Sequence, residues 1–318
     1  MGLIAPQYQT EEGARAWLES QLWPEGPVCP HCGVIGEATK LDREEGSDFH
    51  GRKGLYQCRG CRKQFTITVG TIMEDSHIPL HKWMLAFHLM CSSKKGVSAL
   101  QLQRELELGS YRSAWFMCHR IRWAMTQSPF TKMLSGVVEV DETYVGGKTT
   151  AKRGGRPGKP TPDSNKTPVL ALLERGGNVR SFPIERATLK NIKPIVKKHI
   201  DPTTHLVTDE SPIYYMMKPE FFRHSTVNHA LKEYVRRDEN YFKVTTNTVE
   251  SFFALLKRSN YGVHHHMSRK YLGSYCAERD FVYNNRRVTD NERTNKALES
   301  SRGKRLMLKE PKGATGLA

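Results

Sequence analysis

Three carboxylates lie where a fold can bring them together around a metal ion. Asp141 ends the apolar segment "VVEVD", Asp209 ends "HLVTD", and Glu250 lies within "NTVESFFALLKR". Two carboxylates at one edge of a sheet repel each other, which is costly unless a cation lies between them. Hard oxygen donors suit Mg²⁺ or Mn²⁺, and two such ions stabilise the attacking and leaving oxygens in phosphodiester chemistry. The acids therefore predict metal-dependent chemistry on a phosphodiester.

The third acid depends on a helix that packs against the sheet. Glu250 and Lys257 fall on one face of this helix, with Asn247 one turn before Glu250. Lys257 can hold a DNA phosphate or screen charge near the acids. Each acid alone is a weak signal, because a strand-end Asp is often a turn residue and a helical Glu is usually solvated. Apolar side chains at helical spacing predict the buried face, namely Val249, Phe252, Phe253 and Leu256.

Two cysteine pairs near the N-terminus predict a second, closed metal site. Cys29 and Cys32 are separated from Cys58 and Cys61 by 25 residues. Two tight turns of this kind place four thiolates in a tetrahedron, which is typical of structural Zn²⁺. Two chance pairs or a redox site are the alternatives, although no thioredoxin-like unit accompanies them. Four thiolates leave no open position, so the zinc holds the fold and does no chemistry.

Charge and composition point to a polyanionic partner inside the cell. Lysine and arginine number 49 against 33 acids, a formal charge of +16, which favours nucleic acid over plain solubility as the explanation. An odd count of seven cysteines with paired spacing predicts a reducing cytoplasm. No apolar run reaches membrane-spanning length and no secretion signal opens the chain, so no membrane partner is expected.

A helix, a short turn and a second helix are predicted over residues 96–126, with Ser98 as the cap of the first, just as Thr10 is expected to cap an earlier helix. One interpretation is a helix-turn-helix whose second helix enters a major groove of DNA. The alternative is an ordinary helical connector. Trp115 and Phe116 are expected to point inward, and the polar side of the second helix is expected to carry Arg112, His119, Arg120 and Arg122.

Downstream of Gly136, predicted strands and helices alternate, which indicates a mixed α/β domain. Gly176 and Gly177 are expected to turn a hairpin. Residues 147–166 are a Gly/Pro-rich basic loop that either clamps DNA or is a solvated insertion. Its basic residues include Lys152, Arg153 and Arg156.

Four histidines in the second half of the chain have less specific interpretations. Three successive histidines, 264–266, are expected to contact phosphate or to pack, because neighbouring residues rarely converge on one ion. His229 is interpreted as a sheet-end histidine or as a residue supporting the metal site.

The segments "VEVDETYVGGK", "LVTDES", "TVNH" and "NTVESFFALLKRSNYGVHHHMSRKYL" together resemble the DDE-type insertion-sequence transposases with an N-terminal zinc ribbon and an RNase H-like catalytic domain. The resemblance runs from the first helix to about residue 300. It implies an α/β fold with an RNase H-like mixed sheet, preceded by the ribbon and a helix-turn-helix-like module. The expected divisions are 1–75 for the N-terminal helix and zinc ribbon, 76–130 for the helical DNA-binding module, 131–300 for the catalytic domain and 301–318 for a basic disordered tail.

The resemblance also assigns roles to residues. Asp141 and Asp209 match the first two catalytic acids, Glu250 the third, and Lys257 the basic residue that follows it. Asn247 lies one turn before Glu250, so either residue can complete the metal site. Glu250 is favoured because a carboxylate gains more from Mg²⁺ than an amide does. The residues expected to contact DNA are Arg112, Arg120, Arg122, Lys152, Arg153, Arg156, Lys257 and Arg258.

The function implied is cleavage of DNA at the ends of an insertion sequence and strand transfer to target DNA, through a two-metal-ion mechanism. Acting on two terminal inverted repeats implies a homodimer or higher oligomer, associated with the nucleoid in a bacterial cytoplasm. Two alternatives stay open. One is a catalytically inactive, domesticated DNA-binding regulator, and the other is an RNase H-like nuclease that cuts without joining.

Overall fold

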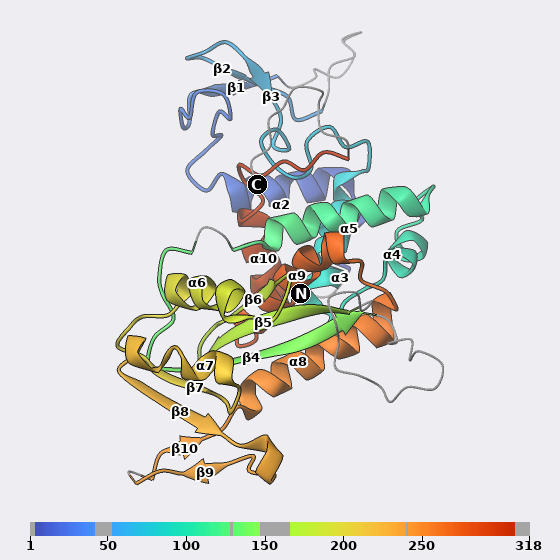
Figure 1. The fold of residues 1–318 in the computed structure, drawn as a ribbon. Coiled ribbons are helices and arrows are strands. Elements are labelled where there is room, and N and C mark those ends of the chain that lie inside the picture. The colour runs from blue at the N-terminus through green and yellow to red at the C-terminus, as the bar shows by residue number, and fades with distance from the viewer. Residues whose placement is uncertain (1–3, 42–52, 128–129, 147–165, 240, 309–318) are drawn as a thin grey trace. The chain divides into compact units, whose positions relative to one another are not determined.

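The computed structural model describes residues 4–41, 53–127, 130–146, 166–239 and 241–308 of the chain (Figure 1). Its contacts divide the chain into two compact units. The first combines Met1–Ser93, Val97–Met125 and Val288–Ala318, and the second combines Lys94–Gly96 with Thr126–Arg287. Segments from both ends of the chain therefore share the first unit.

Six of the described helices lie in the first unit. Thr10 and Ser98 cap two of them as the sequence predicts, because their side chains accept hydrogen bonds from Gly13 N at 3.0 Å and Gln101 N at 3.1 Å. A capping box that starts at Thr289 begins another. The helices are α1 (Pro6–Gln9), α2 (Glu11–Leu22), α3 (Leu80–Ser92), α4 (Ala99–Glu105), α5 (Tyr111–Met125) and α10 (Asp290–Glu299).

A small antiparallel sheet forms the ribbon of the first unit. Its strands β1 (Ala38–Lys40), β2 (Tyr56–Cys58) and β3 (Gln64–Phe65) lie in the order β1-β2-β3 (Figure 1). Trp23 packs edge-on against the rings of Tyr56 and Phe65, at centroid distances of 5.2 and 5.8 Å. This aromatic cluster is small for a core, so a metal centre is a natural source of further stability.

A five-stranded mixed sheet forms the centre of the second unit, in the order β6-β5-β4-β7-β8. Strand β4 runs antiparallel to β5 and parallel to β7. The β5–β6 pair is the hairpin predicted at Gly176 and Gly177. The mixed-sheet α/β fold expected from the sequence is confirmed. The strands are β4 (Val137–Gly146), β5 (Lys166–Glu174), β6 (Val179–Pro183), β7 (His205–Asp209) and β8 (Arg223–Val227).

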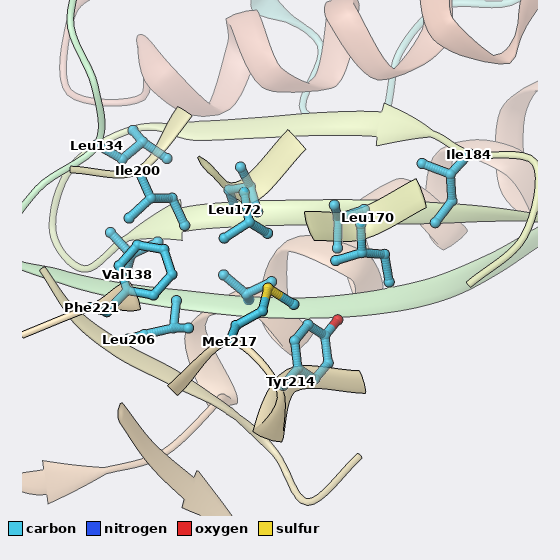
Figure 2. Close-up of a cluster of buried hydrophobic side chains, with 13 residues drawn as sticks. Leu134, Val138, Leu170, Leu172, Ile184, Ile200, Leu206, Tyr214, Met217 and Phe221 are labelled. Carbon is cyan, nitrogen blue, oxygen red and sulfur yellow. The ribbon is translucent and has the colours of Figure 1, made fainter. Parts of the chain in front are cut away.

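Successive side chains of a strand point to opposite faces of the sheet, and different helices cover the two faces. Val138 and Val140 point to one face, where they join a buried cluster with residues of α6 (Leu189–His199) and α7 (Pro212–Tyr215), as Figure 2 shows in part. The other face packs against α8 (Asn247–Ser259) and α9 (Leu272–Asn284). The odd-numbered residues of β4, including Asp141, therefore lie on the face covered by α8.

Short elements complete the second unit. A hairpin of β9 (Arg236–Arg237) and β10 (Lys243–Val244) leads into the start of α8 (Figure 1). A π-helical turn, η3, continues from the end of α8. The single-turn elements are η1 (Lys218–Glu220), η2 (His229–Leu231), η3 (Asn260–His264) and η4 (Arg269–Tyr271).

The two units do not coincide with the domain divisions expected from the sequence. The ribbon and the helices that follow it both belong to the first unit. Helix α10, which the sequence assigns to the catalytic domain, also belongs there and contacts α3, α2 and α5. The expected tail lies outside the described residues from position 309 onward. The domain divisions of the sequence therefore remain predictions.

A helix that crosses a membrane must be long and predominantly apolar. Within the described residues, no helix has the length and apolar character needed to cross a membrane.

Candidate active site and zinc site

The four paired cysteines form one cluster in the ribbon. Their sulfur atoms all lie within 4.8 Å of one another. Cys29 Sγ is 3.6 Å from Cys61 Sγ, and Cys32 Sγ is 3.6 Å from Cys58 Sγ. A Zn–S bond of about 2.3 Å in a tetrahedron places the sulfurs roughly 3.8 Å apart, so the cluster has the size that zinc requires. The backbone amide of Cys61 lies 3.5 Å from Cys58 Sγ, where it favours the thiolate.

The register of the large sheet brings the first two predicted acids to one edge. Parallel pairing of β4 with β7 aligns Glu139 with Val207. Continuing that register by two residues places Asp141 level with Asp209, just beyond the last paired residues of the two strands. Both aspartates are odd-numbered members of their strands and so lie on the face toward α8.

Burial and neighbouring negative charge act on Asp141 together. Burial, followed by the charge of Glu142 and those of Asp209 and Glu250, raises the pKa of Asp141 to about 8. The backbone amide of Glu142 donates a hydrogen bond to Asp141 Oδ1 at 2.8 Å and offsets part of this rise. Asp141 therefore lies within electrostatic reach of both of the other predicted acids.

Asp209 belongs to the same group of negative charges. Burial raises its pKa, the amide of Ser211 and the ring of His229 lower it, and the charge of Glu210 raises it. The amide of Ser211 donates to Asp209 Oδ1 at 3.0 Å. No lysine or arginine among the described residues forms an ion pair with Asp141 or Asp209. The two aspartates thus share a negative site that a cation would neutralise.

Glu250 lies in the first turn of α8 and is the most exposed of the three acids. Its side chain is 43% exposed. Its Oε1 accepts a hydrogen bond from Thr246 Oγ1 at 3.1 Å and lies 3.4 Å from His229 Nε2. Asn247, one turn earlier, is also exposed. Both candidates for the third metal ligand are therefore exposed at the start of the same helix, and the choice between them stays a prediction.

Oxygen donors make this acidic site suitable for Mg²⁺ or Mn²⁺, with Asp141, Asp209 and either Glu250 or Asn247 as the ligands. The site is more open than the zinc site. Among the described residues, only the four cysteines bring three or more ligand atoms within 4.8 Å of one another. The raised pKa of Asp141 and Asp209 is the property that fits a cation, because a positive ion would relieve both burial and repulsion.

His229 lies closer to the acids than its sequence context indicates. Its ring lies 3.4 Å from Glu250 Oε1 and 3.3 Å from the Thr246 hydroxyl. It therefore supports the carboxylate that projects from α8, as the second interpretation proposed.

Two glutamates of β4 also belong to the surroundings of the site, and sequence reasoning missed both. Glu142 accepts a hydrogen bond from the buried hydroxyl of Tyr214, and burial raises the pKa of Glu142. Glu139 is completely buried beside α8. The double acid "DE" at 141–142 was the one local signal for Glu142, and no local pattern marks Glu139 as buried.

Helix α5 follows the predicted helix-turn-helix outline but turns a different face inward. Arg112 is exposed, as predicted. Arg120 and Arg122 are only 7% and 2% exposed, and His119 is also buried, so their placement on a solvent-facing polar side is wrong. The other buried residues of α5 include Ala114, Met117, Cys118 and Ile121.

The surroundings of Arg120 explain its burial. Its guanidinium donates a hydrogen bond to the carbonyl of Glu74 and lies 5.5 Å from the ring centroids of both Trp83 and Phe116. Burial lowers the pKa of Arg120. Phe116, predicted to point inward, is thus a partner of the arginine, and Trp115 and Phe116 are both half-buried. Arg120 ties α5 to the segment before α3.

The structure gives the exposure of the other residues predicted to contact DNA, and the contact itself stays a prediction. Lys257 and Arg258 are exposed at the end of α8. Among the three histidines at 264–266, His265 and His266 are exposed, and the ring centroid of His264 lies 4.8 Å from that of Tyr275. The remaining candidates are Lys152, Arg153 and Arg156. They lie outside the described residues, as does most of the basic loop that contains them.

Comparison with known proteins matches both parts of the chain to transposase domains. Residues 133–284 match the ISXO2-like transposase domain, and residues 9–64 match the transposase zinc-ribbon domain. A protein of the transposable element ISH50 from Halobacterium salinarum, described as uncharacterized, is 27% identical over 265 residues, covering 79% of this chain and 83% of that protein.

One solved structure, the simian T-cell lymphotropic virus intasome in complex with PP2A regulatory subunit B56 gamma, also matches. The match spans 63% of each chain at 15% identity. Its TM-score is 0.25, so the likeness supports no conclusion about this chain.

Proposed function

We propose that this chain, which joins a transposase zinc ribbon to an ISXO2-like transposase domain and so belongs with the insertion-sequence transposases, catalyses metal-dependent DNA cleavage and strand transfer. Its substrates are the ends of an insertion sequence and a target DNA. Two element ends must be handled together, so the active form is at least a dimer.

The observation that carries this proposal is the uncompensated acidic site. Asp141 and Asp209 lie level on adjacent parallel strands, on the face toward α8, and Glu250 projects from the first turn of that helix. A partly buried cluster of like charge is destabilising by itself, and groups of this kind are concentrated at functional sites. Within a transposase domain, that function is to hold metal ions against a DNA phosphodiester.

The proposed metal ligands come from the sheet and from the helix. Asp141 and Asp209 hold Mg²⁺ or Mn²⁺ from the sheet, and Glu250 or Asn247 completes the site from α8. Two such ions supply activation of the attacking oxygen and stabilisation of the departing one.

Other side chains support the ligands and the substrate. His229 orients the carboxylate of Glu250 from the side, because its ring lies 3.4 Å from Oε1. Lys257 and Arg258, farther along α8, hold the backbone of the DNA through their positive charge.

The test uses end-labelled DNA carrying the ends of the element that encodes this chain, with Mg²⁺ and a target plasmid. The wild-type protein is expected to nick the ends and join them to the target. Asp141→Asn and Asp209→Asn should each reduce cleavage by about 10³-fold, the equivalent of roughly 4 kcal/mol of transition-state stabilisation, while DNA binding is retained. Normal cleavage by both variants would refute the assignment.

The same assay separates the alternatives. Nicked ends without joined products would indicate a nuclease that does not transfer strands, and DNA binding without nicks would indicate a regulator. Glu250→Gln and Asn247→Ala identify the third ligand, since the variant that loses more cleavage marks the residue in contact with the ions. Glu250→Gln is expected to be the more severe of the two.

A further inference from the structure

Glu139 is a buried carboxylate whose position links the sheet to the helix that carries the third ligand. It lies in β4 two residues before Asp141, so both residues are on the face toward α8. Its exposed fraction is 0%. A buried carboxylate is stable only when its oxygens are hydrogen-bonded or paired with a positive charge. Its partners therefore show what holds it there.

The start of α8 supplies three of these partners. The amides of Thr248 and Val249 donate to Glu139 Oε2 at 2.9 and 3.0 Å, and the Thr248 hydroxyl donates to Oε1 at 2.9 Å. Thr246, at the N-cap position, makes no side-chain capping bond. Glu139 thus provides the cap from a neighbouring strand. Its negative charge also meets the positive end of the helix dipole.

Arg175, in the β5–β6 turn, completes the arrangement. Its Nε lies 2.9 Å from Glu139 Oε1, and its other nitrogens donate to the carbonyls of Lys243 at 2.9 Å and Thr245 at 3.0 Å. The same guanidinium lies 5.3 Å from the ring centroid of Phe242. One arginine therefore fixes the chain that leads into α8, while Glu139 fixes the first turn itself.

The hydrogen bonds of Glu139 affect the distance between the proposed metal ligands. Asp141 and Glu139 share one strand, and Glu250 and Asn247 share the start of α8. The hydrogen bonds of Glu139 are direct connections between that strand and that turn. We infer that Glu139 is a positioning residue, which together with Arg175 sets the separation between Asp141 and the ligand on α8. The inference rests on the proposed function, because it assumes that these residues bind a divalent ion.

The experiment measures Mn²⁺ affinity directly on the full zinc-loaded chain, using the electron paramagnetic resonance signal of free Mn²⁺. Glu139→Gln leaves every proposed metal ligand in place. It is expected to weaken Mn²⁺ binding by about tenfold or more, the usual effect of removing a residue that orients a metal ligand. If this variant does not fold, Arg175→Lys is the second variant. Lysine lacks the planar guanidinium fork whose three nitrogens make these contacts, and the same loss of affinity is expected.

A matched control separates positioning from general stability. Asp280, in α9, is also a buried carboxylate that bridges to the sheet, accepting hydrogen bonds from the Ser181 amide at 2.8 Å and hydroxyl at 2.6 Å. Asp280→Asn replaces one of these two acceptor oxygens with a donor, and it should keep the wild-type Mn²⁺ affinity within about twofold. Equal affinities for the Glu139 and Asp280 variants would overturn the inference. Absence of Mn²⁺ binding by the wild type would instead overturn the proposed metal site, and the inference with it.

Discussion

At the scale of individual residues, the acidic site is a group of carboxylates whose negative charges repel one another. Asp141, Glu142 and Asp209 all have a raised pKa, for which burial is the largest cause. Tyr214 relieves Glu142 through a hydrogen bond, and backbone amides relieve the two aspartates in part. The four cysteine sulfurs pose the same problem of like charges, and they have the spacing at which one tetrahedral Zn²⁺ would neutralise them.

The raised pKa of Asp141 makes stability depend on pH in a defined direction. The carboxyl has an ordinary pKa of 3.8 and a folded-state pKa of about 8. Its ionisation therefore opposes folding, and the wild type loses stability as pH rises from about 4 to about 8 and levels off above that. In buffer without divalent ions, Asp141→Asn should gain about 2 kcal/mol or more relative to the wild type across this range, a figure reduced from the full shift for partial exposure.

The measurement is urea unfolding of both proteins at pH 5 and pH 9. Asp201→Asn serves as the control of opposite sign, because hydrogen bonds from Thr203 lower the pKa of Asp201. That pairing is intact above the ordinary pKa and is lost as pH falls through the lowered one, so this variant should lose stability relative to the wild type at both pH values. A difference between Asp141→Asn and wild type that stays constant with pH would show that Asp141 has an ordinary pKa.

Among the helices, some have a buried face that spacing predicts and others do not. The apolar residues of α8 predicted to face the sheet, Val249, Phe252, Phe253 and Leu256, are all buried. Helix α5 is covered on more than one side, because it contacts both α4 and α10. Amphipathic spacing predicts one buried face, and it fails for a helix enclosed by several neighbours.

Two arginines on α5 provide a test of this difference. Arg112→Ala should change stability by less than about 0.5 kcal/mol and lower the slope of DNA affinity against salt by about one counterion, if this helix binds DNA. Arg120→Ala should lower stability by about 2–4 kcal/mol, because it removes a buried hydrogen bond and leaves a cavity beside Trp83. Chemical denaturation and binding titrations at several salt concentrations measure both effects. A change in salt slope for Arg120→Ala without loss of stability would contradict its burial.

In the molecule as a whole, two units carry different chemistry on one basic chain. The first unit contains the zinc site and α5, and the second contains the acidic site. The net charge of +16 favours contact with DNA without specifying a sequence. The division predicts that disruption of the cysteine cluster leaves the acidic site intact.

Cys58→Ser tests this independence. Cys58 is fully buried among the ribbon residues, and loss of one thiolate should abolish zinc binding, which contributes about 10 kcal/mol or more to the stability of small zinc domains. We expect the ribbon to unfold and DNA-end binding to fall, while Mn²⁺ affinity at the acidic site stays within about twofold of the wild type. Zinc content by elemental analysis, DNA binding and the Mn²⁺ titration measure the three quantities. Retained zinc-dependent melting and unchanged DNA binding would contradict the assignment.

Features that are local in the chain were predictable without knowledge of the fold. Pairs of cysteines with two residues between them specify a metal knuckle, caps at Thr10 and Ser98 specify helix starts, and alternation in β4 specifies which residues share a face. The acids Asp141 and Asp209 could be assigned to strands for the same reason. These features follow from backbone geometry over a few residues, which is the same in any fold.

Which distant side chains meet could be known only once the chain was folded. Strand order places β8, and with it His229, beside the end of β7, and no local pattern encodes that order. The burial of Arg120, the membership of α10 in the first unit and the cap that Glu139 provides for α8 all depend on contacts between segments far apart in the chain. A charged residue is expected at the surface because burial of charge is costly, and only the fold supplies the partners that make such burial stable.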